Sequence, residues 1–233
     1  MIKTVIFDLD DTLYNETDYC RSGFASVAAF LASQPNTPGE EQIFNALWGQ
    51  FSGGNQTRTF NAALDQLSIT YDDAFIAELI NQYRCHTPSL VLPQDSRNVL
   101  DQLSPNYTLG LLTDGFLPAQ QLKVAALGIE KYFKAIIYTE ALGREFWKPS
   151  PVAFKKILAT LSAKAEETVY IADNPIKDFI APNQLGWATI QLIRPNRVHT
   201  DLPKNPDTVP QHTIDDITKL PDMLRSAGGV NSN

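Results

Sequence analysis

The stretch Lys3-Thr4-Val5-Ile6-Phe7-Asp8-Leu9-Asp10-Asp11-Thr12-Leu13 joins a short apolar run to a cluster of acidic residues. Residues 3–7 are rich in β-branched and aromatic side chains, which is typical of a buried strand. The polar residues begin at Asp8, so they follow the carboxyl end of that strand. Ligands of open α/β sheets bind beyond this end of the strands. The segment therefore predicts the first core strand and the beginning of a functional site.

The chain beyond Pro93 alternates between short apolar runs and segments of helical periodicity. The predicted strands cover residues 107–112, 134–138, 168–172 and 188–192. The predicted helices cover residues 95–103, 118–127, 151–161 and 176–185. This alternation favours a mostly parallel, doubly wound sheet with helices on both faces, so the predicted fold class is α/β.

The segment of residues 14–90 contains no convincing strand. Helical spacing covers about residues 17–34, 58–67 and 72–86, and Thr37-Pro38-Gly39-Glu40 predicts the start of another helix with a capping box. A Gly-rich break, Ser52-Gly53-Gly54-Asn55, interrupts the helical pattern. We expect a core domain of residues 1–13 and 91–228, a helical insertion of residues 14–90 and a flexible tail of residues 229–233.

The composition excludes several classes of protein. The chain has 233 residues, of which 43% are hydrophobic, so it is not a disordered chain. Its 19 Lys and Arg against 26 Asp and Glu give a net charge of −7, which argues against nucleic acid or an anionic membrane as partner. It has no signal-peptide pattern and no apolar run that could span a bilayer. With only Cys20 and Cys85 as cysteines, we expect a soluble cytoplasmic protein.

Polar residues follow the predicted strands where each of them ends. Because the carboxyl ends of parallel strands meet at one edge of a sheet, these side chains are expected to lie close together. Carboxylates brought this close repel each other unless a divalent cation neutralises them. Mg²⁺ takes oxygen ligands and keeps several waters, which suits a site shared with a phosphate. The residues concerned are Asp8, Asp10, Asp11, Thr12, Thr113, Asp114, Lys148, Asp173 and Asp178.

Four ordered motifs in these segments resemble those of the haloacid dehalogenase-like (HAD) superfamily. They are Asp8-Leu9-Asp10-Asp11-Thr12, Thr113 at the end of the second strand, Lys148-Pro149 before a helix, and Asp173 with Asp178. The resemblance spans nearly the whole chain. Asp11 and Ala172 stand where glycine is common, and Asp114 stands where asparagine is more usual. These departures leave the catalytic side chains intact.

The resemblance implies a C1-capped phosphatase with a Rossmann-like core and an inserted all-helical cap. Asp8 would be the nucleophile that forms an aspartyl phosphate, and Asp10 would protonate the leaving oxygen and then take a proton from water. Thr113 and Lys148 would hold the phosphoryl oxygens. Asp178 lies at the start of the predicted helix of residues 176–185, where an acidic residue also favours the helix dipole, so a structural role stays open beside its place as a direct or an indirect ligand. The implied Mg²⁺ ligands are Asp8, Asp10, Asp173 and Asp178.

Substrate binding is expected from the loops around the phosphate and from the cap. We assign Thr12, Asp114, Gly115 and Arg58 to this group, although Arg58 is equally well explained as a solvated residue of a helix. Asp11 is expected to form a turn. A cap of this size favours a small phosphorylated metabolite, such as a sugar phosphate or a nucleoside monophosphate, as substrate. Monomer and homodimer both stay open.

The leading hypothesis is therefore an Mg²⁺-dependent phosphomonoesterase. A phosphomutase of the same family and a non-catalytic phosphate-binding or regulatory module stay open as alternatives. A dehalogenase needs no acid for the leaving group, so the presence of Asp10 argues against it. A phosphonatase needs a lysine in the cap, and residues 14–90 contain none. No G-x-G-x-x-G follows a strand, which disfavours a dinucleotide-binding dehydrogenase.

Overall fold

The chain divides into two compact units. The computed structural model describes residues 1–226, so the predicted tail at residues 229–233 lies outside the described residues. Met1–Thr17 and Val91–Asn233 form one unit, here called the core unit, and Asp18–Leu90 form the other, the helical unit. The sequence placed this boundary at residue 14. Residues 14–17 group with the core unit because the Tyr14 hydroxyl donates a hydrogen bond to Asp10 and the Glu16 amide donates one to Asp11.

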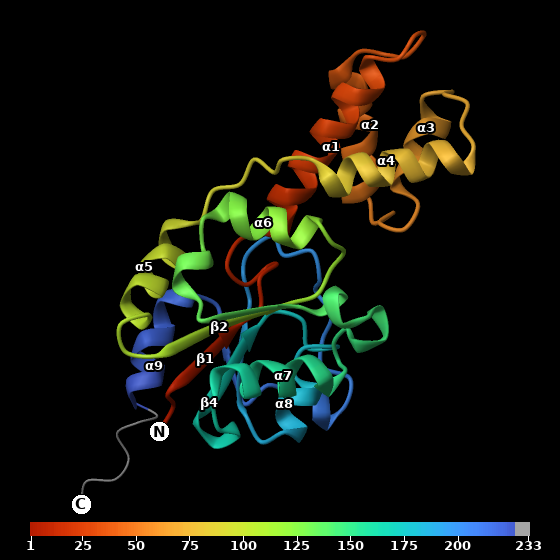
Figure 1. Ribbon diagram of the computed structural model, residues 1–233. Helices are drawn as coiled ribbons and strands as arrows, with labels where there is room; N and C mark the ends of the chain where they lie inside the picture. Colours follow the sequence, from red (N-terminus) through yellow and green to blue (C-terminus); the bar gives the residue numbers. More distant parts are fainter. Residues whose placement is uncertain (227–233) are drawn as a thin grey trace, which may run out of the picture. The chain divides into compact units, whose positions relative to one another are not determined.

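The core unit contains a six-stranded sheet in the order β3-β2-β1-β4-β5-β6 (Figure 1). All neighbouring strands are parallel. The sequence predicted five of these strands and missed the short edge strand β6. The strands are β1 (Thr4–Phe7), β2 (Thr108–Thr113), β3 (Ala135–Tyr138), β4 (Thr168–Ala172), β5 (Ala188–Leu192) and β6 (His212–Ile214).

Helices cover both faces of this sheet (Figure 1). Helices α5 (Gln94–Leu103) and α9 (Leu220–Ser226) pack together on one face, and α7 (Pro151–Leu161) and α8 (Ile180–Gln184) cover the other. Helix α6 (Ala119–Leu127) follows β2. Alternate residues of each strand face opposite layers, and Ile6 of β1 is buried in one apolar cluster with Phe154 of α7 and with Trp187, which lies between α8 and β5. The predicted α/β fold class is confirmed.

Helix α8 is shorter than the predicted helix of residues 176–185. A turn takes the place of its first residues because two local hydrogen bonds stabilise it. The Asn174 amide donates to the Asp178 carboxylate at 2.9 Å, and the Ile176 amide donates to the Asn174 side chain at 3.1 Å. Asp178 therefore lies ahead of the helix, in a buried turn.

The regular elements of the helical unit are helices, α2 (Glu40–Ser52), α3 (Thr59–Gln66), α4 (Asp73–Cys85) and most of α1 (Glu16–Ala32). They bury an apolar cluster of their own that includes Phe24, Leu31 and Leu47. The predicted capping box is wrong, because α2 begins at Glu40 and has no side-chain cap. Thr37 instead donates to two carbonyl oxygens at the end of α1, at 2.7 and 2.8 Å.

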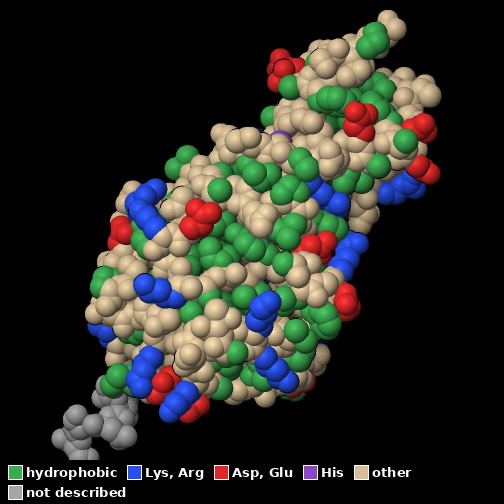
Figure 2. Space-filling view, viewed as in Figure 1, with side chains coloured by type: hydrophobic (Ala, Val, Ile, Leu, Met, Phe, Trp, Pro, Cys, Tyr) green, Lys and Arg blue, Asp and Glu red, His purple; other side chains and the backbone are tan. Residues whose placement is uncertain are grey.

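The described surface shows no gathered positive charge on the face that is drawn in Figure 2. Lys and Arg side chains of the core unit are scattered there among hydrophobic and acidic side chains. Binding of a nucleic-acid backbone usually needs a basic patch. Within residues 1–226, no helix is long and apolar enough to cross a membrane.

Candidate active site

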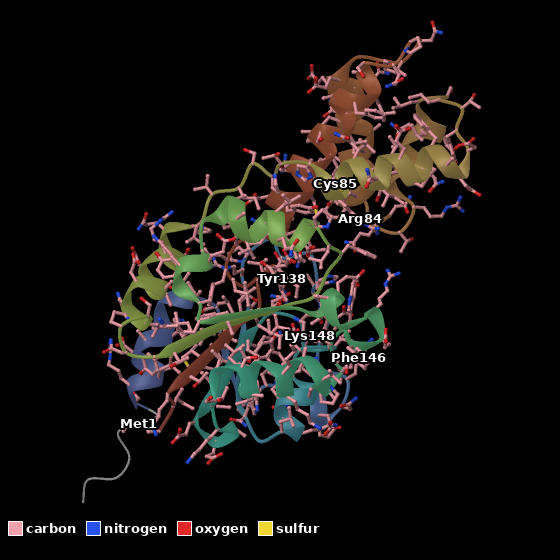
Figure 3. The ribbon with its side chains drawn as sticks, viewed as in Figure 1. Met1, Arg84, Cys85, Tyr138, Phe146 and Lys148 are labelled. Carbon is pink, nitrogen blue, oxygen red and sulfur yellow. The ribbon has the colours of Figure 1, made fainter. Side chains whose placement is uncertain are left out.

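Four segments of the core unit supply the predicted catalytic residues. Asp8 follows β1, Thr113 ends β2 and Asp173 follows β4. Phe7 pairs in register with Leu111 of β2 and Ile171 of β4, so these three strands end at the same edge of the sheet. The fourth segment is the loop before α7, and Figure 3 shows its Lys148 inside the core unit. The topology therefore brings together the residues that the four motifs predicted.

A tight turn shapes the loop after β1. Asp11 has a φ of 52°, which is the left-handed region where Asp is among the better tolerated residues. Its carboxylate accepts hydrogen bonds from the amide of Glu16 at 2.8 Å and from the amide of Val198 at 2.6 Å. Asp11 thus joins the loop to the start of α1 and to the segment after β5. It forms a turn, as the sequence predicted.

Lys148 lies at the centre of a buried charge cluster. Its Nζ is 2.8 Å from Asp8 Oδ1 and 2.6 Å from Asp178 Oδ1, and it donates to the Tyr170 hydroxyl at 3.2 Å. The Lys148 side chain is 0% exposed. Burial alone would lower the pKa of Lys148, but the carboxylates of Asp178 and Asp8 outweigh it and hold that pKa well above its usual value. The site therefore contains a permanent positive charge in contact with the predicted nucleophile.

Asp8, Asp173 and Asp178 form a cluster in which one oxygen from each residue lies within 4.8 Å of the others. Burial, together with the neighbouring carboxylates Asp178 and Asp8, raises the pKa of Asp173 to about 9. Burial also raises the pKa of Asp8 to about 7, although Lys148 acts in the opposite direction. Asp173 Oδ2 is buried and has no hydrogen-bond partner among the described residues. An orphaned oxygen in a set of oxygen donors fits Mg²⁺.

The Asp10 side chain lies apart from this cluster and is surrounded by donors. Lys123 Nζ contacts both carboxylate oxygens, at 2.9 and 3.0 Å, and Gln120 Nε2 donates to Oδ2 at 2.8 Å. The Tyr14 hydroxyl donates to Oδ1. Burial alone would raise the pKa of Asp10, but Lys123 and these hydrogen bonds outweigh it and lower that pKa below its usual value. Asp10 is thus an anion that can accept a proton.

A cavity of about 220 Å³ opens onto these groups within the core unit. Phe116 and Trp147 give it an apolar wall, and their rings lie 5.3 Å apart. Trp147 is therefore a pocket residue. Sequence reasoning missed Glu16, Lys177 and His199. The lining residues are Asp8, Asp10, Glu16, Asp114, Gly115, Phe116, Trp147, Asp173, Lys177 and His199.

The other predicted residues lie in different surroundings. Thr113 is buried, and its Oγ1 accepts a hydrogen bond from Gln120 Nε2 at 2.7 Å. Asp114 Oδ1 accepts hydrogen bonds from the Thr139 hydroxyl at 2.8 Å and from the Lys148 amide at 3.2 Å, so it joins two loops of the site. Thr12 is fully buried, and its hydroxyl has no partner among the described residues. Thr12 does not line the cavity.

Arg58 belongs to the helical unit, where it is exposed and precedes α3. A role for Arg58 in substrate binding therefore stays a prediction.

Gln120 and Lys123 were also not predicted from the sequence. Both lie on the buried side of α6 together with Val124 and Leu127. The signal that could have found them is their spacing, because polar residues at the apolar positions of an amphipathic helix need partners inside the protein.

Comparisons with known proteins agree with this arrangement. Residues 5–192 match the haloacid dehalogenase-like hydrolase family. The chain is 30% identical over 231 residues to a glyceraldehyde 3-phosphate phosphatase of Methanopyrus kandleri, with 97% of this chain and 98% of that protein covered. It is 29% identical to a protein of the same name from Methanocaldococcus jannaschii, with 97% and 98% covered.

Among solved structures, the HAD-hydrolase YfnB of Bacillus subtilis has the same fold. The TM-score is 0.69 at 22% identity, and 96% of this chain and 98% of that chain are covered. The match over residues 5–192 also confirms the prediction of a hydrolase-family enzyme. The four strand-end motifs and these matches together show that the chain belongs to the haloacid dehalogenase-like hydrolase family.

Proposed function

We propose that this chain is an Mg²⁺-dependent phosphomonoesterase that forms a phosphoryl-enzyme on Asp8. The observation that supports this most strongly is the surroundings of Asp8. Its carboxylate lines the cavity, contacts Lys148 Nζ at 2.8 Å and lies in one cluster with the orphaned oxygen of Asp173. A nucleophile, a fixed cation and carboxylate oxygens that can hold a metal ion are the parts that phosphoryl transfer to a carboxylate needs.

In the first step, an oxygen of Asp8 attacks phosphorus and the bond to the leaving oxygen breaks. Asp10 supplies the proton that the leaving oxygen takes up, so the product leaves as an alcohol. For this step Asp10 must first gain a proton, which the incoming phosphate monoanion can bring. Lys148 and the Thr113 hydroxyl hold the phosphoryl oxygens and stabilise their negative charge.

In the second step, a water attacks the phosphorus of the aspartyl phosphate. Asp10 takes a proton from that water, and the bond between phosphorus and Asp8 breaks. The lowered pKa of Asp10 keeps its carboxylate ionised before this step, and the same shift makes it a weaker base, so the step depends on the position of Asp10 beside the attacking water. Inorganic phosphate and free Asp8 are the products.

Asp8 and Asp173 would hold Mg²⁺ through their carboxylates, and Asp10 would contribute its backbone carbonyl. The bound ion would neutralise the repulsion between the Asp8 carboxylate and the incoming phosphate. Asp178 already contacts Lys148 through Oδ1 and the Asn174 amide through Oδ2. We therefore assign Asp178 to holding Lys148 in place.

We propose a small substrate. The cavity of about 220 Å³ is smaller than the range of roughly 300–1,000 Å³ that is usual for sites of drug-sized ligands. The two relatives named glyceraldehyde 3-phosphate phosphatases support a small phosphorylated sugar as the first candidate. Nucleoside monophosphates form the second class to test.

The test measures phosphate release from a panel of phosphorylated metabolites, with Mg²⁺ or with EDTA. The panel begins with glyceraldehyde 3-phosphate and includes sugar phosphates, nucleoside monophosphates and phenyl phosphate. We expect release that needs Mg²⁺ and is lost in Asp8→Asn, while the exposed control Asp201→Asn keeps it. Equal release by native protein and Asp8→Asn would contradict the proposal. Transfer of phosphate between positions of one sugar, without release, would indicate a mutase.

A further inference from the structure

Helix α6 directs two polar side chains into the interior of the core unit. Gln120 is 1% exposed and Lys123 is 4% exposed, on the same side of the helix as Val124 and Leu127. Lysine is rarely buried to this extent unless it is paired, because removing its charge from water is costly. Neither Gln120 nor Lys123 lines the cavity. Any effect that they have on the reaction must therefore pass through other side chains.

The side chain that links Lys123 to the cavity is Asp10. Lys123 Nζ lies at nearly equal distances, 2.9 and 3.0 Å, from the two oxygens of the carboxylate. Gln120 donates to one of these oxygens, and Tyr14 donates to the other. Donors on three sides leave the carboxylate a single orientation, in which it still lines the cavity. Proton transfer depends on such fixed geometry.

Gln120 also joins Asp10 to the loop after β2. Its Nε2 donates to Thr113 Oγ1 at 2.7 Å and contacts the carbonyl oxygen of Asp114. The Asp10 carboxylate and the Asp114 carbonyl can only accept hydrogen bonds, so the Gln120 amide must face them with its nitrogen and not with its oxygen. The amide therefore holds the proton-transfer residue and a phosphoryl-binding hydroxyl in one fixed relation.

Gly115 provides the space for this arrangement. Its φ is 136°, and a Cβ at this position would lie 2.8 Å from Gln120 Cδ. A side chain here would push the Gln120 amide away from its acceptors. The loop after β2 is thus shaped around Gln120.

We propose that Gln120 and Lys123 are positioning residues for the proton transfers of Asp10, and this inference rests on the proposed function. In the first step, the Asp10 proton goes to the leaving oxygen as the bond from phosphorus to that oxygen breaks. In the second step, Asp10 takes a proton from the attacking water as the bond from phosphorus to Asp8 breaks. Lys123 contacts both Asp10 oxygens, so it holds the side chain whichever oxygen carries the proton.

The test compares kcat/KM for two aryl phosphates of similar size, phenyl phosphate and 2,4-dinitrophenyl phosphate, at saturating Mg²⁺. Phenolate is a poor leaving group and needs an acid, whereas dinitrophenolate leaves without a proton. For Lys123→Met we expect kcat/KM to fall about 100-fold with phenyl phosphate and less than about 3-fold with dinitrophenyl phosphate. Gln120→Leu is the second variant, used if Lys123→Met does not fold. Because Gln120 also donates to Thr113, we expect this variant to lose activity with both compounds, and to lose more with phenyl phosphate than with dinitrophenyl phosphate.

Two controls separate positioning from general damage. Lys155→Met removes an exposed lysine from α7 and is expected to change neither rate. In an Asp10→Asn background, Lys123→Met is expected to cause no further loss, because the residue through which it acts is already gone.

Equal losses with both phosphates, or a full additional loss in the Asp10→Asn background, would overturn the positioning role and leave the proposed function intact. No phosphate release by the native chain from either compound would overturn the proposed function and this inference with it.

Discussion

The carboxylate cluster predicts that Mg²⁺ binding is coupled to proton release. In the metal-free protein, burial and neighbouring carboxylates raise the pKa of Asp173 to about 9, and burial raises that of Asp8 to about 7. Both carboxyls must lose their protons before they can bind the ion. Below the pKa of each carboxyl, the proton that must leave lowers the apparent Mg²⁺ affinity about tenfold per pH unit. We therefore expect this affinity to fall about 100-fold between pH 9 and pH 7, where Asp173 holds a proton, and about 50-fold more at pH 6, where Asp8 holds one as well.

The assay is calorimetric titration with Mg²⁺ in buffers of different ionisation enthalpy, which counts the protons released. We expect about one proton per ion at pH 8 and about two at pH 6. Asp173→Asn is expected to weaken binding and to remove the proton that is released at pH 8. The matched control Asp201→Asn removes an exposed carboxyl and is expected to change neither value. An affinity that stays constant from pH 6 to pH 9, without proton release, would refute the reasoning.

Three further predictions concern single positions. Lys148→Met leaves two buried carboxylates without their cation, so we expect a loss of about 3–5 kcal/mol in the free energy of unfolding of the metal-free protein, measured in denaturant; an unchanged value would contradict the ion pairs. The pKa of Asp173 is raised to about 9 in the folded protein, so its carboxyl contributes stability that is fully present below the pKa of the unfolded chain and is lost as the pH rises through 9. In EDTA, we therefore expect Asp173→Asn to raise the Tm more at pH 8 than at pH 5. An equal change of the Tm at the two pH values would contradict this prediction. Gly115→Ala places a Cβ against Gln120 and strains a positive φ, so we expect the free energy of unfolding to fall by about 1–3 kcal/mol and kcat to be lower. A variant with the native free energy of unfolding and the native kcat would exclude the contact.

The sequence predicted the parts of the fold that have a strong local pattern. Strand β1 is a continuous apolar run, and all four of its residues are buried in the sheet. Strand β6 has three residues, of which His212 and Thr213 are exposed. It is defined by its pairing with β5, and no apolar run in the sequence marks it. An edge strand of this kind depends on tertiary contacts that a local pattern does not contain.

The same distinction applies to the site. Asp8, Thr113 and Asp173 could be predicted because each stands where a recognisable strand ends. The contact of Lys148 with Asp178 could not, because it depends on a turn that takes the place of the first part of a predicted helix. Gln120 and Lys123 were missed for another reason. They lie within a helix, and only the packing of α6 on the loops after β1 and β2 gives them their partners.

The central claim is that Asp8 becomes phosphorylated during turnover. The most direct test is an acid-quenched single turnover with the best phosphorylated substrate, labelled with ³²P, followed by mapping of the labelled peptide. We expect Mg²⁺-dependent label on the peptide that contains Asp8, removed by hydroxylamine as an acyl phosphate requires and absent in Asp8→Asn. Phosphate release by the native chain without label on that peptide at any quench time would contradict the claim.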